Sequence, residues 1–257
     1  MGNVHVLYIL DTNDPALKSV ASDVSNRLNE EVNHIANALS VSQTTHKVMG
    51  KELSSYRIRE TIEKLEISPL EDIIILCILA HGSNVSNKGR YPTIRLSNTD
   101  KRYVQDIIDL ALLHQPAYLL SIVLTCNANG MVTLEDSKQL HRSDVENFKI
   151  GKPKASFYQT LFAPRKFPLA ITYLSAQQGE VTKFTDTEIV PFSAFMFSLK
   201  YWTSDTHSES PSWDKIMFTA QSLSTYSGHC PYLEIANIHI LPDSSIQYTG
   251  EGLELCK

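Results

Sequence analysis

The sequence has no apolar run of the roughly 18 residues that a membrane-spanning helix requires. The longest apolar stretch, residues 73–80, has the length of a strand. The N-terminus has neither the positively charged segment nor the cleavage site of a secretory signal peptide. Met1 and Gly2 match the start of a myristoylation site, but Val6 stands where that site needs Ser or Thr. From these absences we expect a cytoplasmic protein that does not associate with membranes.

Cysteine is scarce, and its four copies form no C-x-x-C pair and no cysteine–histidine spacing typical of zinc sites. We therefore expect reduced thiols, no bound metal and no cofactor. Positive charge is also limited. The 23 Lys and Arg residues are outnumbered by 28 Asp and Glu residues, and they are scattered along the chain. This distribution lacks the basic surface that nucleic-acid binding requires.

Apolar runs alternate with amphipathic helical patterns through the first half of the chain. Runs that are apolar throughout are typical of strands buried on both faces, as in parallel sheets. The order of elements predicts an α/β fold with a mainly parallel central sheet flanked by helices on both faces. We expect strands at residues 4–10, 46–49, 73–80, 91–96 and 119–125, and helices at residues 17–39, 56–65 and 101–114.

Residues 131–166 interrupt this alternation, because they are polar and basic and show no period. Their length predicts a loop that is either functional or disordered. A solvated loop is the simplest interpretation, and a linker that the protein cleaves itself is the alternative. Beyond it, the chain shows no further linker, so we expect one domain over residues 1–257. The remaining strands are expected at residues 168–176, 232–236 and 238–241, and helices are expected to open at Pro191 and at Ser210-Pro211.

Two of the predicted buried strands end in residues suited to covalent chemistry. The strand at 73–80 ends at His81-Gly82, and the strand at 119–125 ends at Cys126. Ligands of open parallel sheets bind at the carboxyl ends of the strands, and neighbouring strands would bring these residues together. An imidazole beside a thiol generates a nucleophile. Gly82, which has no Cβ, could bring its N–H close to a carbonyl and form an oxyanion hole with the N–H of Cys126.

With these motifs in these positions, the sequence resembles the caspase-like cysteine peptidases, which include metacaspases and the CHAT peptidases. The strand followed by A-H-G and the strand followed by T-C-N are similar to the family's histidine and nucleophile motifs. Their separation, 126 − 81 = 45 residues, is near the roughly 50 typical of caspases. The stretch L-S-A-Q-Q-G-E-V at residues 174–181 is similar to the family's cleft border. The resemblance covers most of the chain and leaves the branch open.

The resemblance implies a role for each matching residue. Cys126 would attack the scissile carbonyl, and His81 would act as general acid and base. Leu124 replaces the acidic residue that many metacaspases place in the pocket for a basic P1 side chain. No arginine fork is apparent nearby, so we expect cleavage after basic or apolar residues rather than after aspartate. The substrate-binding residues expected are Asp11 and Asp14 in the first loop, Leu124, and Glu180, Val181 and Thr182 in a segment that would pair with the substrate.

The sequence therefore predicts a cytoplasmic cysteine endopeptidase that uses a Cys–His dyad on protein substrates. A binding or scaffold module on the same fold, without catalysis, is the alternative from another class. A thiol-dependent acyl hydrolase of small substrates would use the same dyad. The sequence leaves open whether a partner, a dimer or self-cleavage activates the protein. It also leaves open whether the pathway is cell death, stress or defence.

Overall fold

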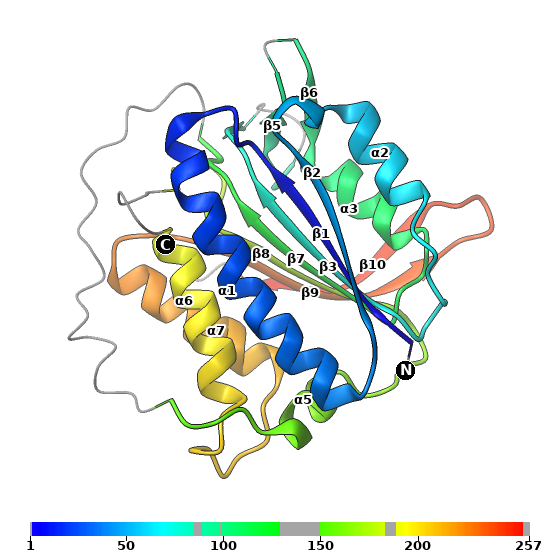
Figure 1. Ribbon diagram of the computed structural model, residues 1–257, viewed down its shortest axis with the longest axis vertical. Coiled ribbons are helices and arrows are strands. Elements are labelled where there is room, and N and C mark those ends of the chain that lie inside the picture. Colours follow the sequence, from blue (N-terminus) through cyan, green and yellow to red (C-terminus); the bar gives the residue numbers. More distant parts are fainter. Residues whose placement is uncertain (1, 85–88, 98, 129–149, 183–188, 254–257) are drawn as a thin grey trace.

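A computed structural model describes residues 2–84, 89–97, 99–128, 150–182 and 189–253 (Figure 1). Seven strands of the described chain form one sheet in the order β10-β9-β8-β7-β3-β1-β2. The five strands from β8 to β2 in that order are parallel, and β9 runs antiparallel to both of its neighbours. The strands are β1 (Val4–Leu10), β2 (Gln43–Met49), β3 (Ile73–Leu79), β7 (Tyr118–Leu124), β8 (Leu169–Leu174), β9 (Tyr232–Ile240) and β10 (Ile246–Leu253).

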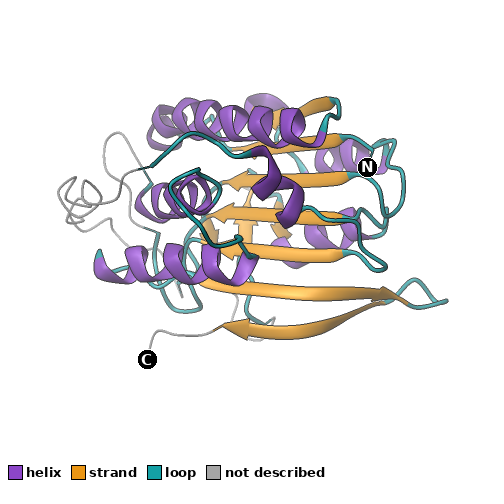
Figure 2. Ribbon diagram, turned by 90° about the horizontal axis from the view of Figure 1, so that it is seen from below, coloured by secondary structure: helices purple, strands orange, loops and turns teal. Residues whose placement is uncertain are grey.

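Helices pack on both faces of this sheet (Figure 1). One face contacts α1, α5, α6 and α7, and the other contacts α2 and α3. Figure 2 shows the strands side by side, with the β9–β10 hairpin at one edge. None of the helices in the described part of the chain has the length and apolarity needed to cross a membrane. The helices are α1 (Pro15–Leu39), α2 (Ser55–Glu63), α3 (Val104–Leu112), α5 (Ala155–Leu161), α6 (Val190–Trp202) and α7 (Trp213–Tyr226).

The central strands β1, β3 and β7 are apolar except at His5 and Ser121, because helices cover both of their faces. Successive side chains of a strand point to opposite faces. In β1, Tyr8 and Leu10 belong to the core under α1, whereas Leu7 and Ile9 belong to the core under α2 and α3. All seven residues of β1, of β3 and of β7 are buried. The sheet is therefore a rigid support whose carboxyl edge can hold side chains in fixed positions.

A second, small antiparallel sheet follows β3 directly. It consists of β4 (Gly82–Ser83), β5 (Thr93–Arg95) and β6 (Lys101–Tyr103), in that order. Ile94 of β5 is fully buried in the core beside α3. The neighbouring side chains of β5 point the other way and reach the carboxyl edge of the large sheet, where they line a cleft.

The predicted fold class is confirmed: the chain is α/β, with a mainly parallel sheet between two helical layers. Three local predictions were wrong. Residues 155–161, predicted as loop, form α5, because Phe157, Tyr158 and Leu161 bury one side of a helical turn. Residues 101–103, predicted as helix, form β6. The two short strands predicted at 232–241 are one strand, β9, and its partner β10 was missed. Residues 131–149 of the predicted loop lie outside the described residues.

Candidate active site

The ends of β3 and β7 come together at the carboxyl edge of the sheet. The two strands are parallel neighbours, and Leu79 pairs with Leu124. His81 and Cys126 each follow two residues after that pair. Gly82 contacts the other strand end so closely that a Cβ atom there would collide with the Thr125 side chain and lie 2.6 Å from the carbonyl oxygen of Cys126. The strand register therefore brings the two expected reactive residues to one place.

His81 and Cys126 line the same open cleft, which has a volume of about 490 Å³. The cleft lies between the ends of β3 and β7, the start of α1 and the small sheet. Its lining includes His81 and Cys126 from the carboxyl ends of the strands, the acid Asp14, and the cations Arg95 and Lys101. The lining residues are Asp14, His81, Gly82, Ser83, Asn84, Thr93, Arg95, Lys101, Cys126 and Val181.

Cys126 is half-buried, and its thiol donates a hydrogen bond to the carbonyl oxygen of Thr182, with Sγ 3.9 Å from that oxygen. Burial raises the pKa of the Cys126 thiol above its ordinary value, because a thiolate loses solvation there. Burial thus favours the neutral thiol over the thiolate. A base must remove its proton before it can act as a nucleophile.

His81 faces a carboxylate from the start of α1. Its Nε2 lies 3.1 Å from Oδ2 of Asp14, a contact that becomes an ion pair when the imidazole is protonated. The pKa of Asp14 is lowered: burial would raise it, but the interaction with His81 and the backbone N–H groups of Leu17 and Ala16 outweigh that effect. Asp14 is therefore an anion when His81 becomes a cation.

The carboxylate of Asp14 also caps the N-terminus of α1. Its Oδ1 accepts hydrogen bonds from the backbone N–H of Ala16, at 2.8 Å, and of Leu17, at 3.3 Å. Asp14 is the N-cap of the helix, and Pro15 occupies its first turn. One oxygen of Asp14 thus fixes its position on the helix while the other faces His81.

Hydrogen bonds fasten the segment after β8 to the segment after β7. The backbone N–H of Asn127 donates to the carbonyl oxygen of Glu180 at 2.9 Å, and that of Gly179 donates to Asn127. The buried hydroxyl of Thr182 donates to the carbonyl oxygen of Thr125 at 2.7 Å. Together these bonds hold Val181 at the border of the cleft, beside Cys126.

Of the remaining expected site residues, Asp11 and Leu124 are buried away from the cleft, and Glu180 is exposed. Asp11 is 8% exposed and does not line the cleft; its carboxylate accepts from the backbone N–H of Asn13. Leu124 is fully buried in the core. It has no surface that a substrate could contact, so the reading of Leu124 as a pocket residue has no support in this conformation. Glu180 contributes a backbone carbonyl and exposes its side chain.

The sequence interpretation missed Arg95 and Lys101, which come from the small sheet and line the cleft beside His81. The strand predicted at residues 91–96 contains Arg95, and the alternation of Thr93, Ile94 and Arg95 places Arg95 on the face opposite the buried Ile94. The turn between β5 and β6 then brings Lys101 opposite Arg95.

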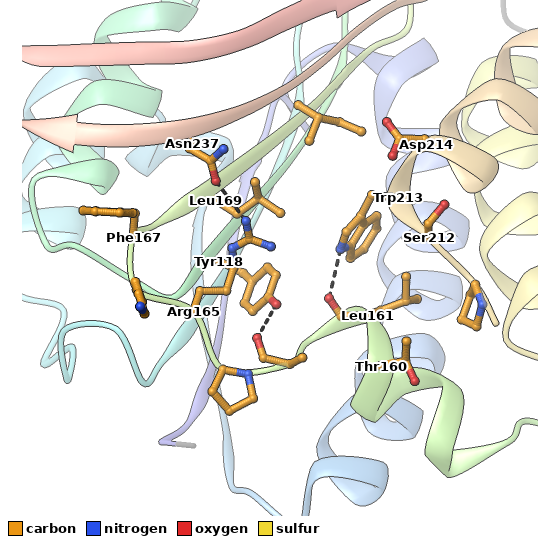
Figure 3. Close-up of a pocket in the computed structure, with 15 residues that line it drawn as sticks. Tyr118, Thr160, Leu161, Arg165, Phe167, Leu169, Ser212, Trp213, Asp214 and Asn237 are labelled. Atoms are coloured by element: carbon orange, nitrogen blue, oxygen red, sulfur yellow. Dashed lines mark hydrogen bonds between the residues drawn. The ribbon is translucent and has the colours of Figure 1, made fainter.

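A larger cavity, of about 630 Å³, lies at the other end of the sheet, beside the first residues of β7 and β8 (Figure 3). Its most conspicuous polar groups bond to one another or to backbone. Arg165 donates to Asn237 at 2.9 Å, and the indole N–H of Trp213 donates to the carbonyl of Leu161 at 3.1 Å. No cysteine or histidine lines it. The cleft with His81 and Cys126 is therefore the better candidate for an active site.

Comparisons with known proteins agree with the architecture. No protein-family model and no curated protein sequence matches the chain. Among solved structures, the chain is similar to the crystal structure of caspase-1 from Spodoptera frugiperda. The TM-score is 0.52 at 11% sequence identity, and the match covers 86% of this chain and 77% of that chain. At this identity the likeness shows the fold alone: the chain has a caspase-like fold.

Proposed function

We propose that the protein is a cysteine endopeptidase with Cys126 as nucleophile and His81 as general acid and base. The observation that supports this proposal best is the cleft at the carboxyl edge, which both side chains line. The caspase-like fold agrees with it. The dyad acts without a cofactor, because the thiol supplies the electrons and the imidazole moves the proton.

The reaction begins with transfer of the thiol proton of Cys126 to His81. The thiolate then attacks the carbonyl carbon of the substrate, a C–S bond forms, and the electron pair of the C=O bond moves to oxygen. The N–H groups of Gly82 and Cys126 stabilise this oxyanion. As the oxyanion collapses, the C–N bond breaks and His81 gives its proton to the leaving amine. Water then hydrolyses the thioester, with His81 as base, and the thiol returns.

Asp14 acts in this proposal as a positioning residue. During the reaction His81 is an imidazolium, and the carboxylate 3.1 Å from its Nε2 stabilises that charge. Because Asp14 is fixed to the first turn of α1, the carboxylate also orients the ring. This interaction replaces the role in substrate binding that the sequence suggested for Asp14.

The substrate would lie along the segment that contains Glu180, Val181 and Thr182 and add a strand to it. Asp14 lines the cleft from the start of α1, whereas Asp11 does not line it. The cations that line the cleft come from the small sheet, not from this segment. We therefore keep the proposal that the P1 residue is basic or apolar rather than aspartate.

An electrophilic peptide probe tests the function. It should label the wild-type protein at Cys126, fail to label Cys126→Ala and label His81→Ala slowly. Absence of labelling under all activating conditions would favour the scaffold alternative instead. Cleavage of small thioesters or esters without cleavage of any peptide would indicate an acyl hydrolase. Comparison of protein N-termini between wild-type and Cys126→Ala cells would reveal substrates and any self-cleavage.

A further inference from the structure

The cleft carries two cations whose charge the described part of the protein leaves unbalanced. Arg95 and Lys101 are exposed, and both line the cleft. Neither forms an ion pair with any described residue. The acid that shares the cleft with them, Asp14, faces His81, and Asp100 beside Lys101 accepts hydrogen bonds from Ser55.

The strand register holds these two cations directly opposite each other. Arg95 of β5 pairs with Lys101 of β6, so their side chains leave the small sheet on the same face. Like charges in such a pair repel and destabilise the sheet. A bound anion between them would remove the repulsion. The register therefore favours an anionic group of a ligand at this wall of the cleft.

A third residue of this wall has an unpartnered donor. Asn84 follows β4, lines the cleft and is 7% exposed. Its side-chain Nδ2 has no hydrogen-bond partner among the described residues. A carboxylate is an acceptor for amide and guanidinium donors alike. The wall thus combines two cations with one free donor.

The position of His81, as the proposed general acid, indicates which part of a substrate would meet this wall. The backbone N–H of Arg95 donates to the carbonyl oxygen of His81 at 2.8 Å, so β5 lies directly beside the general acid. The general acid protonates the leaving amine and therefore faces the segment on the C-terminal side of the scissile bond. The acyl segment lies instead toward Val181 and Cys126.

We infer that Arg95 and Lys101 recognise an acidic side chain on the leaving-group side of the scissile bond. The inference rests on the proposed peptidase function and adds to it a class of substrate: peptides with Asp or Glu shortly after the cleavage point. It is independent of the P1 residue, which meets the opposite part of the cleft.

Matched peptide substrates test the inference. They share one acyl segment, chosen from the probe that labels Cys126 best, and carry Glu, Gln or Lys at each of the first three positions after the scissile bond. We expect kcat/KM for one Glu peptide to exceed that of its Gln counterpart about three- to tenfold at low salt, with Lys lowest. Higher salt should reduce the difference, because the groups are exposed.

Variants then assign the preference to the two cations. In Arg95→Gln/Lys101→Gln, the ratio of kcat/KM between the Glu and Gln peptides should fall to about one. In Arg95→Glu, the Lys peptide should become the better substrate. Lys166→Gln, at the opposite end of the sheet, removes an exposed cation away from the cleft and should leave the ratio unchanged.

The outcomes separate this inference from the proposed function. Absence of labelling by the acyl-segment probe would contradict the peptidase proposal itself. Labelling and cleavage with equal rates for Glu and Gln peptides would overturn the inference alone. So would an acid preference that remains in the double variant, or one that occurs only on the acyl side.

Discussion

The contact between Asp14 and His81 leads to a prediction for Asp14→Asn. Asparagine is as good an N-cap as aspartate, so this variant keeps the start of α1 and removes only the charge. At 3.1 Å, two unit charges interact by about 1.3 kcal/mol in a medium as polar as water. The side chains are 40% and 33% exposed, so solvent screening holds the effect near or below that value.

We therefore expect Asp14→Asn to lower kcat about three- to tenfold, with KM little changed, because the charge acts on the imidazolium that forms during the reaction. The loss should shrink as salt is added. The assay is steady-state cleavage of one peptide at two ionic strengths. Asp23→Asn is the matched control: it removes an exposed, ion-paired carboxylate from the same helix, and it should leave kcat unchanged.

Asp14→Ala separates the charge from the cap. It should lose the same activity as Asp14→Asn and, in addition, about 1 kcal/mol of stability, because α1 loses its N-cap.

The lowered pKa of Asp14 means that its ionised form stabilises the fold above about pH 4. The stability difference between wild type and Asp14→Asn should therefore shrink as the pH falls below that value. If Asp14→Asn and Asp23→Asn have the same kcat at both salt concentrations, Asp14 does not act on His81.

Three further predictions concern other parts of the structure. Gly82→Ala should abolish labelling of Cys126 and lower the melting temperature, since the new methyl group would collide with the end of β7. Burial raises the pKa of Glu31 to about 7 from 4.5, so the folded state holds a proton that the unfolded chain releases, and wild-type stability should fall between those pH values. Glu31→Gln should remove this fall and be more stable than wild type at pH 8, by up to about 3 kcal/mol in chemical denaturation; equal pH dependence of the two proteins would refute the assignment. Thr182→Val removes one of the two hydroxyl groups that donate to the buried carbonyl of Thr125, the other being that of Ser175, and should cost about 1 kcal/mol, whereas Thr182→Ser should restore most of it.

The sequence was sufficient to predict the strands that are buried on both faces, because their side-chain pattern is apolar and continuous. β3 is apolar at every position, and β7 at every position except Ser121, because both faces are covered, and that pattern has few other interpretations. The positions of His81 and Cys126 at strand ends followed from the same runs. The wall formed by the small sheet could not be predicted in this way. A strand was expected at residues 91–96, but residues 101–103 were expected in a helix, and the pairing of Arg95 with Lys101 depends on the turn between β5 and β6.

Of the two roles of Asp14, only the N-cap could be predicted from the local sequence. N-caps are predictable from sequence, because the preference for Asp before a helix is local. The second partner, His81, is separated from Asp14 by 67 residues, and only the pairing of β1 with β3 brings them together. Leu124 illustrates the converse. A position inferred by resemblance to line a pocket is, by the alternation of β7, directed into the core.

The parallel pairing of β7 with β8 joins two halves of the chain that are far apart in sequence. Residues up to 128 supply β1, β2, β3 and β7, and residues from 150 onward supply β8, β9 and β10 of the same sheet. A second contact between the halves joins α1 and α5, where the Tyr158 hydroxyl donates to a carboxyl oxygen of the buried Glu31 at 2.6 Å. Neither half can bury its apolar surface alone. Cleavage of the chain between residues 128 and 150 should leave the two fragments bound to each other. Two fragments produced separately should likewise associate and fold together, as split-reporter proteins do.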